Sequence, residues 1–467
     1  MQITFIGWML IPIGLVSFFL APRILYALTI FFIAFSATAV INTGGAEGKG
    51  VPALFFLGFL CLLREFIGLL VRGRMQFSSF ERAFAIQLLI FLLSVLVSFI
   101  ALLSLDGDVM IESPILTDMS EHAVSFSMQN VTQFLYLLFG SLLSYFLVVK
   151  NFTFLKLRNT LKIYVASMAF VSLWGLMQFL LLKFNYPYPD WLFNNSATKS
   201  AQGFNGLLDI DGIRRISSVA VEPSILSAYL LSGLSFLLPG LWFARPIFSA
   251  RKDWVAVVLS VLVIALSTSS IAYMGIVILF GVFGLLLIFV GQRMAVYIIV
   301  SAICFILFML SYFLMPFIHD FMNMTLFGKS ASYSGLERLK TITNAWNYFT
   351  QHPLFGLGWG SVTSHDLIAN LLANTGIVGF FAFIFLVVYV YRLLMRAMRH
   401  LQTLPEASIE MAFVVSAILA FTTQLIISVI SGFPFVFGYF WFVLGMAISI
   451  SSIVLKEKNI FNQRRAA

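Results

Sequence analysis

Long apolar segments recur along the whole chain, and they constrain its fold more than any other feature. A helix of about 20 apolar residues crosses the roughly 30 Å of hydrocarbon in a bilayer. Hydrophobic residues make up 61% of the 467 residues and charged residues 10%, whereas a soluble domain averages about 25% charged residues. A water-soluble fold could not bury this much apolar surface. The sequence therefore predicts one all-α, polytopic transmembrane domain over residues 1–467.

The apolar segments predict 12 to 13 membrane-spanning helices. The first segment lacks the basic region and cleavage site of a signal peptide, so we expect it to be retained. Cys61 and Cys304 fall within spans and are expected to be packing residues. The expected spans are approximately 3–20, 24–41, 51–71, 83–104, 131–149, 163–182, 217–239, 254–268, 271–290, 294–316, 372–391, 410–430 and 433–453.

The charges divide the connecting segments into two kinds. Short connections are basic, whereas the loops 105–130, 183–215 and 317–366 are acidic or neutral. Basic connections stay in the cytoplasm, so the three long loops are expected outside, with the C-terminus inside. The N-terminus is expected outside for 13 spans and inside for 12. The net charge of +9 then follows from membrane orientation, and no nucleic-acid partner is expected. We expect loop 105–130 to be a solvated acidic loop.

Loop 317–366 contains a predicted amphipathic helix. Ser334-Gly335-Leu336-Glu337 has the pattern of a capping box, which predicts a helix from about Gly335 to Phe349. Arg338 lies in the first turn, where the helix dipole disfavours a cation. Arg338 is therefore either functional or a solvated residue paired with a lipid phosphate. Apolar residues recur on one side of this helix, which predicts that it lies over the membrane surface: Leu336, Leu339, Ile342, Trp346 and Phe349.

A glycine-rich turn follows this helix. Gly356, Gly358 and Gly360 alternate along it, and glycine lets a ligand approach the backbone closely. Such a turn before a helix N-terminus is a candidate anion site, although glycines also serve plain helix reversals. We expect Thr363 or Ser364 to cap the next helix. His365 would then lie in its first turn, either as a proton carrier or as a hydrogen-bonded loop residue.

A third candidate group joins loop 183–215 to a span. Two geometries are open: in a helix, Arg215, Ser218 and Glu222 share one face, whereas a helix that begins at Pro223 places Glu222 at its mouth. Arg214 lies beside Arg215. An ionisable group at the membrane edge indicates function, and the alternative is a structural Arg–Glu pair. The polar break Ser267-Thr268-Ser269-Ser270 is expected to be a plain hairpin.

These groups together suit an anionic, lipid-linked substrate. Arginine clamps a phosphate or diphosphate bidentately, and such a clamp stabilises a diphosphate leaving group without a metal. A carboxylate or imidazole then deprotonates an attacking sugar hydroxyl. No metal and no cofactor are expected.

The order of these motifs resembles the O-antigen polymerase/O-antigen ligase superfamily. The firmest resemblance covers about 334–380, with Arg215 to Ser224 in support. It implies a GT-C-like glycosyltransferase of the bacterial inner membrane, with undecaprenyl-diphosphate-linked oligosaccharides as donor and acceptor and a periplasmic active site. Membrane lipid and a chain-length regulator protein are the other partners it suggests. The residues that carry the resemblance are Arg215-Ile-Ser-Ser-Val-Ala-Val-Glu222-Pro223-Ser224, Ser334-Gly-Leu-Glu-Arg338, His352-Pro-Leu-Phe-Gly-Leu-Gly358, His365, Asn370 and Gly376-Ile-Val-Gly379.

The resemblance also implies individual roles. Arg215 and Arg338 would bind the donor diphosphate, with Arg214, Ser218 and the three glycines in the substrate-binding surface. Arg338 would also stabilise the reaction, His365 would move a proton or orient the acceptor, and Glu222 is a second candidate base. Two positions depart from the family pattern: Ser269-Ser270 is followed by Ile271 rather than by arginine, and His365 is followed by aspartate rather than asparagine.

The Glu222-Pro223-Ser224 motif favours a polymerase, which moves a growing glycan onto another lipid-linked repeat unit. The alternative is a ligase, which moves a finished glycan onto lipid A-core. From another class, a lipid-linked glycan transporter or flippase would require charges within the spans. Arg64 and Glu65 are the clearest such charges. The polar residues collect outside the spans instead, which favours an enzyme.

Overall fold

The computed structural model describes most of the chain and allows the predicted spans to be compared with the observed helices. Of the predicted span 294–316, only Ile298 is among the described residues, and Cys304 lies outside them. The described residues are 1–43, 50–72, 78–105, 107–197, 209–210, 213–290, 298, 323, 332–403, 408–432 and 434–466.

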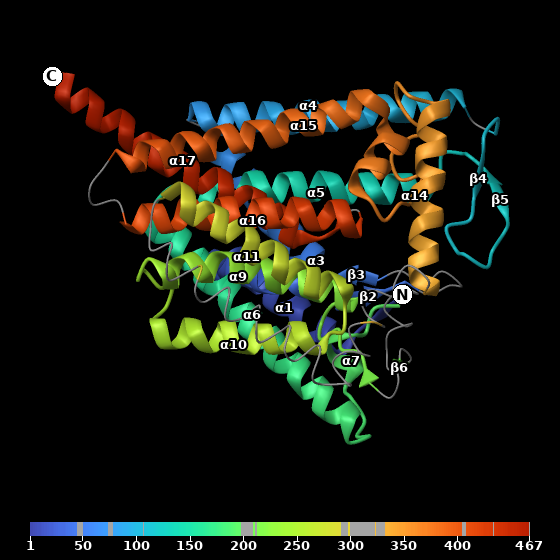
Figure 1. Cartoon of the computed structure of the whole chain (residues 1–467), viewed down its shortest axis with the longest axis horizontal. Coiled ribbons are helices and arrows are strands. Elements are labelled where there is room, and N and C mark those ends of the chain that lie inside the picture. The colour runs from blue at the N-terminus through green and yellow to red at the C-terminus, as the bar shows by residue number, and fades with distance from the viewer. Residues whose placement is uncertain are drawn as a thin grey trace.

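Long apolar helices dominate the described residues, as the sequence predicts. Nine of the described helices are long and apolar enough to cross a membrane. Figure 1 shows them running in a roughly common direction. They confirm an all-α, polytopic membrane protein. These helices are α3 (Ala53–Arg72), α4 (Ser79–Ser104), α5 (Met128–Lys150), α6 (Phe154–Lys183), α9 (Pro223–Trp242), α11 (Ser270–Val290), α15 (Leu367–Gln402), α16 (Ser408–Ser431) and α17 (Gly438–Ala466).

Three further apolar helices are shorter. They are α1 (Phe5–Leu20), α2 (Pro22–Phe31) and α10 (Ala250–Leu266). The prediction of one continuous span over 24–41 is wrong, because a 3-10 turn at Phe32–Ala34 ends the helix and strand β2 (Ala39–Asn42) follows. The backbone of β2 forms its hydrogen bonds with neighbouring strands instead of within a helix. A short apolar run is compatible with either structure, so its hydropathy could not decide between them.

The small sheets and η3 lie at one end of the helical bundle. β2 pairs antiparallel with β1 (Gln2–Ile3) and β3 (Gly50–Pro52), and Gln2 lies opposite Asn42. This pairing holds the N-terminus at the end of the bundle opposite the C-terminus (Figure 1). The remaining short elements are β4 (Met110–Glu112), β5 (Glu121–Ala123), α7 (Asp190–Phe193), β6 (Asp209–Ile210), β7 (Ile213–Arg214) and η3 (Pro434–Val436).

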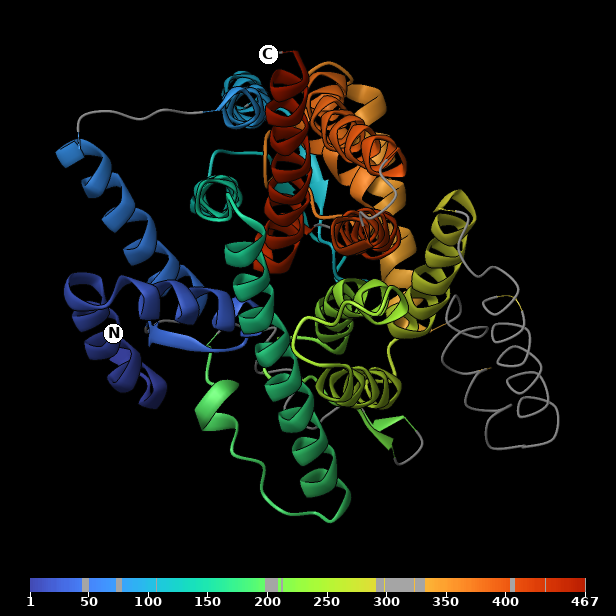
Figure 2. The same cartoon turned by 90° about the vertical axis from the view of Figure 1, so that its left-hand side faces the viewer.

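The core surrounds α17. This helix packs against α5, α15 and α16, and Figure 2 shows it between α5 and α16. Trp441 and Phe442 of α17 are almost completely buried, and the Phe442 ring stacks on Tyr164 of α6 at 4.0 Å between centroids. The C-terminal helix thus joins the early and late spans into one packed body.

Helix α14 (Tyr333–Gln351) lies across the end of this body, at a steep angle to the long helices (Figure 1). Its inner face buries Thr341 and Ala345 beside α15. Leu339 and Trp346 on the other face are exposed, as expected for an amphipathic helix that lies on a membrane surface. The predicted start was two residues late, because Ser332 caps the helix by accepting a hydrogen bond from Gly335 N.

Candidate active site

The charged residues singled out in the sequence gather at the α14 end of the bundle. Arg215 comes from the segment before α9, Arg338 from α14, and Glu222 from the start of α9. Each arginine lies within electrostatic range of Glu222, and Arg215 also within range of Arg338. Residues more than a hundred positions apart in the chain therefore share one site.

Arg215 is half-buried beneath the turn between α10 and α11. Burial lowers the pKa of its guanidinium, the negative charge of Glu222 raises it, and Arg338 lowers it again. Its Nε donates a hydrogen bond to Thr268 Oγ1 at 3.2 Å. Because arginine stays protonated in proteins, this contact fixes the direction of a permanent positive charge.

Arg338 is also half-buried. Burial lowers the pKa of its guanidinium, and the charges of Glu222 and Glu337 oppose that effect. Within the described part of the chain, no carboxylate lies within 4.0 Å of the guanidinium of Arg338 or of Arg215. Two partly desolvated cations without a close counter-ion form a strong site for an external anion.

Glu222 occupies the N-cap position of α9. Its backbone is extended, Pro223 is the first helical residue, and the carboxylate makes no capping bond. This confirms the second of the two geometries considered for this segment. The carboxylate instead accepts a hydrogen bond from Ser224 Oγ, in the first turn of α9, at 2.9 Å, and it lies within electrostatic range of both arginines.

The hydrogen bonds of His365 identify its tautomer. Thr341 Oγ1 donates to the Arg338 carbonyl at 2.9 Å, so its only proton is already used. With the hydroxyl proton on that carbonyl, Nδ1 donates in the 3.0 Å contact between Thr341 Oγ1 and His365 Nδ1, and the lone pair is on Nε2. Burial, with a smaller effect of the Arg338 charge, lowers the pKa of His365 to about 4. The imidazole is thus neutral near pH 7 and able to accept a proton.

The predicted cap of the helix after His365 was wrong. Asp366 caps α15, and its Oδ1 accepts a hydrogen bond from Ala369 N at 2.7 Å. His365 and Asp366 therefore precede the helix instead of forming its first turn. Asp366 is a common capping residue, and Ser364 instead accepts a bond from Asp366 N at 3.4 Å.

Ser218 lies away from the charged group. It is fully buried, and its hydroxyl donates to the Val171 carbonyl at 2.7 Å. Its φ is +53°, so the segment is not helical here and Ser218 does not share a face with Arg215. The structure describes the backbone of Arg214 in β7, whereas its side chain lies outside the described part.

Two positioning residues were missed in the sequence. Gln178 Oε1 accepts hydrogen bonds from Ser217 N and Ser218 N at 3.0 and 2.7 Å, which anchors the segment that carries Arg215. Thr268 holds Arg215 itself, although its turn was expected to be a plain hairpin. Its φ of +48° is a strained value for a β-branched residue, and no local sequence pattern indicates it.

The three glycines of the turn pack against neighbouring helices. A Cβ at Gly356 would lie 2.6 Å from the Ala373 carbonyl oxygen, and one at Gly358 equally close to Leu102 Cβ. A Cβ at Gly360 would lie 3.0 Å from Gln133 Cβ. All three have positive φ, so close packing and backbone conformation together account for glycine at each position.

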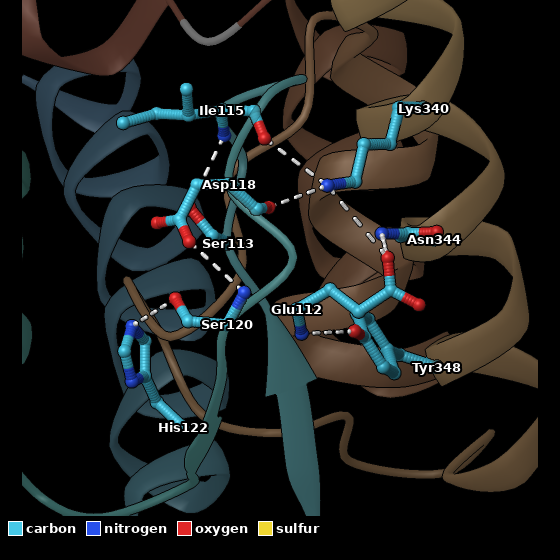
Figure 3. A network of polar contacts seen from close by, with 9 residues as sticks. All are labelled: Glu112, Ser113, Ile115, Asp118, Ser120, His122, Lys340, Asn344 and Tyr348. Atoms are coloured by element: carbon cyan, nitrogen blue, oxygen red, sulfur yellow. Dashed lines mark hydrogen bonds and ion pairs between the residues drawn. The ribbon is translucent and has the colours of Figure 1, made fainter.

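The loop after α4 contacts the same end of the molecule. Figure 3 shows its β4–β5 hairpin docked on α14. Lys340 Nζ donates to the carbonyls of Ile115 and Asp118, both at 3.1 Å, and Glu112 N donates to Tyr348 Oη at 2.8 Å. The loop expected to be merely solvated therefore also braces the helix that carries Arg338.

Comparison with known families bears on this site. Residues 255–384 match the family Wzy_C, described as O-antigen ligase. The resemblance to the O-antigen polymerase/ligase superfamily is thereby confirmed. The matched range contains Thr268, Arg338 and His365, whereas Arg215 and Glu222 precede it. No curated protein matches the chain.

The superfamily supports an enzyme of the polymerase/ligase type, which acts on lipid-linked glycans. Together with the apolar helices, it indicates a multi-pass protein of the inner membrane. A polymerase and a ligase of this type both transfer a glycan, and they differ in the acceptor that receives it.

Proposed function

We propose that the protein is a polymerase of O-antigen or a related surface polysaccharide. It transfers a growing glycan from an undecaprenyl-diphosphate carrier to the sugar of another lipid-linked repeat unit. The observation that carries this proposal is the pair of half-buried guanidiniums, Arg215 and Arg338, without a close counter-ion among the described residues. A diphosphate supplies the missing negative charge.

In this reaction the bond between the anomeric carbon and the diphosphate oxygen breaks. The guanidiniums stabilise the charge that develops on the leaving diphosphate, as donors do in an oxyanion hole. The acceptor hydroxyl oxygen forms the new glycosidic bond, and its proton passes to His365 Nε2 or to the Glu222 carboxylate. All bonds, electrons and protons of this step are accounted for without a metal or a redox partner.

Several features support a periplasmic site. The three long loops 105–130, 183–215 and 317–366 follow the acidic, outward pattern of charge, and together they form the active-site face in this proposal. Helix α14 exposes Leu336, Leu339 and Trp346 at that end, where a membrane surface would receive them. The C-terminus is then cytoplasmic.

A ligase is the second candidate, because the matched family is described as O-antigen ligase. A transporter is less well supported: Glu65, a charge within a span, is paired with Lys150 at 2.6 Å. A paired charge is not left free to bind cargo.

Deletion of the gene in its own host separates polymerase from ligase. Loss of a polymerase leaves single repeat units on lipid A-core, which gel electrophoresis of the lipopolysaccharide detects. Loss of a ligase leaves no glycan on the core and long chains on the lipid carrier. The first pattern supports the proposal, and the second would replace it with the ligase.

A further inference from the structure

A cavity of about 320 Å³ adjoins Glu222. Its walls come from the N-terminal sheet region, α3, α5, the residue before Glu222 and the start of α17. This volume lies within the usual range of small-molecule sites, about 300–1,000 Å³. The aromatic and amide residues that matter most in its lining are Phe35, Phe55, Gln133, Tyr136, Phe437 and Tyr439.

The lining is neutral. Among the described residues that form it, none is Asp, Glu, Lys, Arg or His. The cavity therefore differs in kind from the site of Arg215 and Arg338, which offers two positive charges. A diphosphate has no partner here, because burial of an unpaired charge is strongly unfavourable.

Several polar atoms in the cavity wall lack partners. Gln133 Oε1 is buried without a hydrogen bond. The hydroxyl groups of Tyr136 and Tyr439 also make no hydrogen bond to a described residue, although both residues line the cavity. A ligand that covers such groups without bonding to them loses about 1–3 kcal/mol for each, so a ligand with its own hydroxyl groups would be bound preferentially.

Glu222 lies near both the cavity and the site of Arg215 and Arg338. Val221, its neighbour, lines the cavity, and the charge of Glu222 also acts on Tyr439 in the wall. The same carboxylate lies within electrostatic range of Arg215 and Arg338. A group in the cavity and an anion on the arginines would thus both lie near one potential proton acceptor.

We propose that this cavity binds a neutral sugar at the accepting end of the second glycan, with its attacking hydroxyl directed toward Glu222. Aromatic rings such as Phe55 and Tyr136, 4.8 Å apart at their centroids, cover the apolar faces of the sugar. The amide and phenol groups bind its hydroxyls. The inference rests on the proposed glycosyl transfer.

A lipid chain is the alternative occupant. An isoprenoid or acyl chain matches the aromatic walls, but it offers no partner to Gln133 Oε1 or to the two tyrosine hydroxyls. Covering the two tyrosine hydroxyls without a hydrogen-bond partner opposes binding of a hydrocarbon. The polar atoms therefore favour the sugar.

The test measures two ligands separately on the full chain in lipid nanodiscs. One is the radiolabelled repeat-unit oligosaccharide, freed from its carrier by mild acid, and the other is undecaprenyl diphosphate. The double variant Gln133→Leu/Tyr136→Phe removes two polar partners and nearly preserves volume. Its matched control is Gln87→Leu/Tyr186→Phe, because Gln87 Oε1 is also buried without a partner and neither residue lines the cavity.

The cavity variant should weaken oligosaccharide binding by about tenfold or more and leave undecaprenyl diphosphate binding unchanged. The control should bind both ligands as the wild type does. Unchanged oligosaccharide binding in the cavity variant, no oligosaccharide binding by the wild type, or weaker undecaprenyl diphosphate binding would overturn the inference. Arg338→Ala should show the opposite selectivity. If Arg338→Ala binds undecaprenyl diphosphate as the wild type does, the proposed function fails, whereas the measured binding of the oligosaccharide in the cavity remains valid.

Discussion

Arg215 and Arg338 show how a charged pair is prepared at the residue scale. Each is held by contacts that leave its guanidinium available: Thr268 binds one nitrogen of Arg215, and α14 carries Arg338 near Glu222. Burial lowers the pKa of Arg215, Glu222 opposes that effect, and repulsion from Arg338 lowers the pKa further. An arriving anion reverses this repulsion, so the site binds a diphosphate more strongly than either arginine would alone.

Thr268 provides a prediction about positioning. Thr268→Val keeps the shape of the side chain but removes the acceptor for Arg215 Nε, so turnover in a polymerisation assay should fall by about tenfold. Thr268→Ser restores the hydroxyl and should recover most of the activity. Equal activity of the valine variant and the wild type would show that the 3.2 Å contact does not position Arg215.

His365 provides a prediction about pH. Its pKa is lowered from 6.5 to about 4, so Nε2 stays unprotonated and able to accept a proton until the pH approaches 4. The acid limb of kcat/KM, which reports the free enzyme, should therefore lie near pH 4. A limb near pH 6.5 would contradict this assignment. Residual activity of His365→Asn with the same limb would assign that limb to another group.

The sequence singles out the charged residues of the candidate site, but it does not indicate the contacts that support them. Ionisable residues are conspicuous in a chain of which only 10% is charged, and Arg215, Arg338, Glu222 and His365 are among them. The contacts of Gln178 depend on a backbone conformation that only the folded chain determines. A helical segment before α9 would place Ser218 on the same face as Arg215, and this was one of the two geometries considered. The positive φ of Ser218 excludes that geometry.

At the scale of elements, a break in α15 joins the glycine-rich turn to the bundle. Gly376 has a φ of +62° within the helix. The turn uses the freed backbone groups: Leu357 N donates to the Ala373 carbonyl, and Ile377 N donates to the Pro353 carbonyl, both at 2.8 Å. The short outer part of α15, which follows His365, is therefore held in place by the turn.

Gly376→Ala should destabilise the protein by about 2 kcal/mol or more. The new Cβ would overlap the Leu354 carbonyl, and the alanine would have to keep the left-handed φ of the glycine. Gly281→Ala in α11 is the matched control, since a Cβ there meets nothing within 4 Å. Thermal unfolding followed by tryptophan fluorescence measures both. Equal midpoints for the two variants would show that the break tolerates a side chain.

Secondary-structure elements could be predicted where a long run of apolar residues determines that the chain is helical. The long helices follow from runs of apolar residues, because only a helix satisfies its own backbone in lipid. Prediction failed at 32–41, where a 3-10 turn ends the helix and strand pairing satisfies the backbone groups of Ala39–Asn42. It also missed the start of α14 and the cap of α15, because several serine, threonine and aspartate residues there compete for one capping role.

At the scale of the whole molecule, the two termini lie at opposite ends of the bundle (Figure 1). The N-terminus, the β4–β5 hairpin and α14 share one end, and the C-terminus lies at the other (Figure 1). In the orientation that we propose from the distribution of basic connections, the C-terminal end lies in the cytoplasm. The proposed active site then opens to the periplasm, where lipid-linked glycans would meet it.

A cysteine-labelling experiment tests this orientation. In a background without native cysteines, Asp108→Cys in the first long loop should react with an impermeant maleimide added to spheroplasts. Lys252→Cys, at the opposite end, should react only after lysis. Both positions are exposed, so burial does not explain a difference. Labelling of Lys252→Cys in intact spheroplasts would invert the assigned topology.

The central claim is that Arg215 and Arg338 together bind the diphosphate of the donor. The most direct measurement compares Arg215→Ala and Arg338→Ala with Lys340→Ala, which lies on the same helix as Arg338 but contacts the β4–β5 hairpin. Each chain is expressed in the deletion host at equal membrane level, and its glycan is resolved by electrophoresis. Both arginine variants should lack long-chain glycan, whereas Lys340→Ala should retain it. Normal long-chain glycan in both arginine variants would contradict the account.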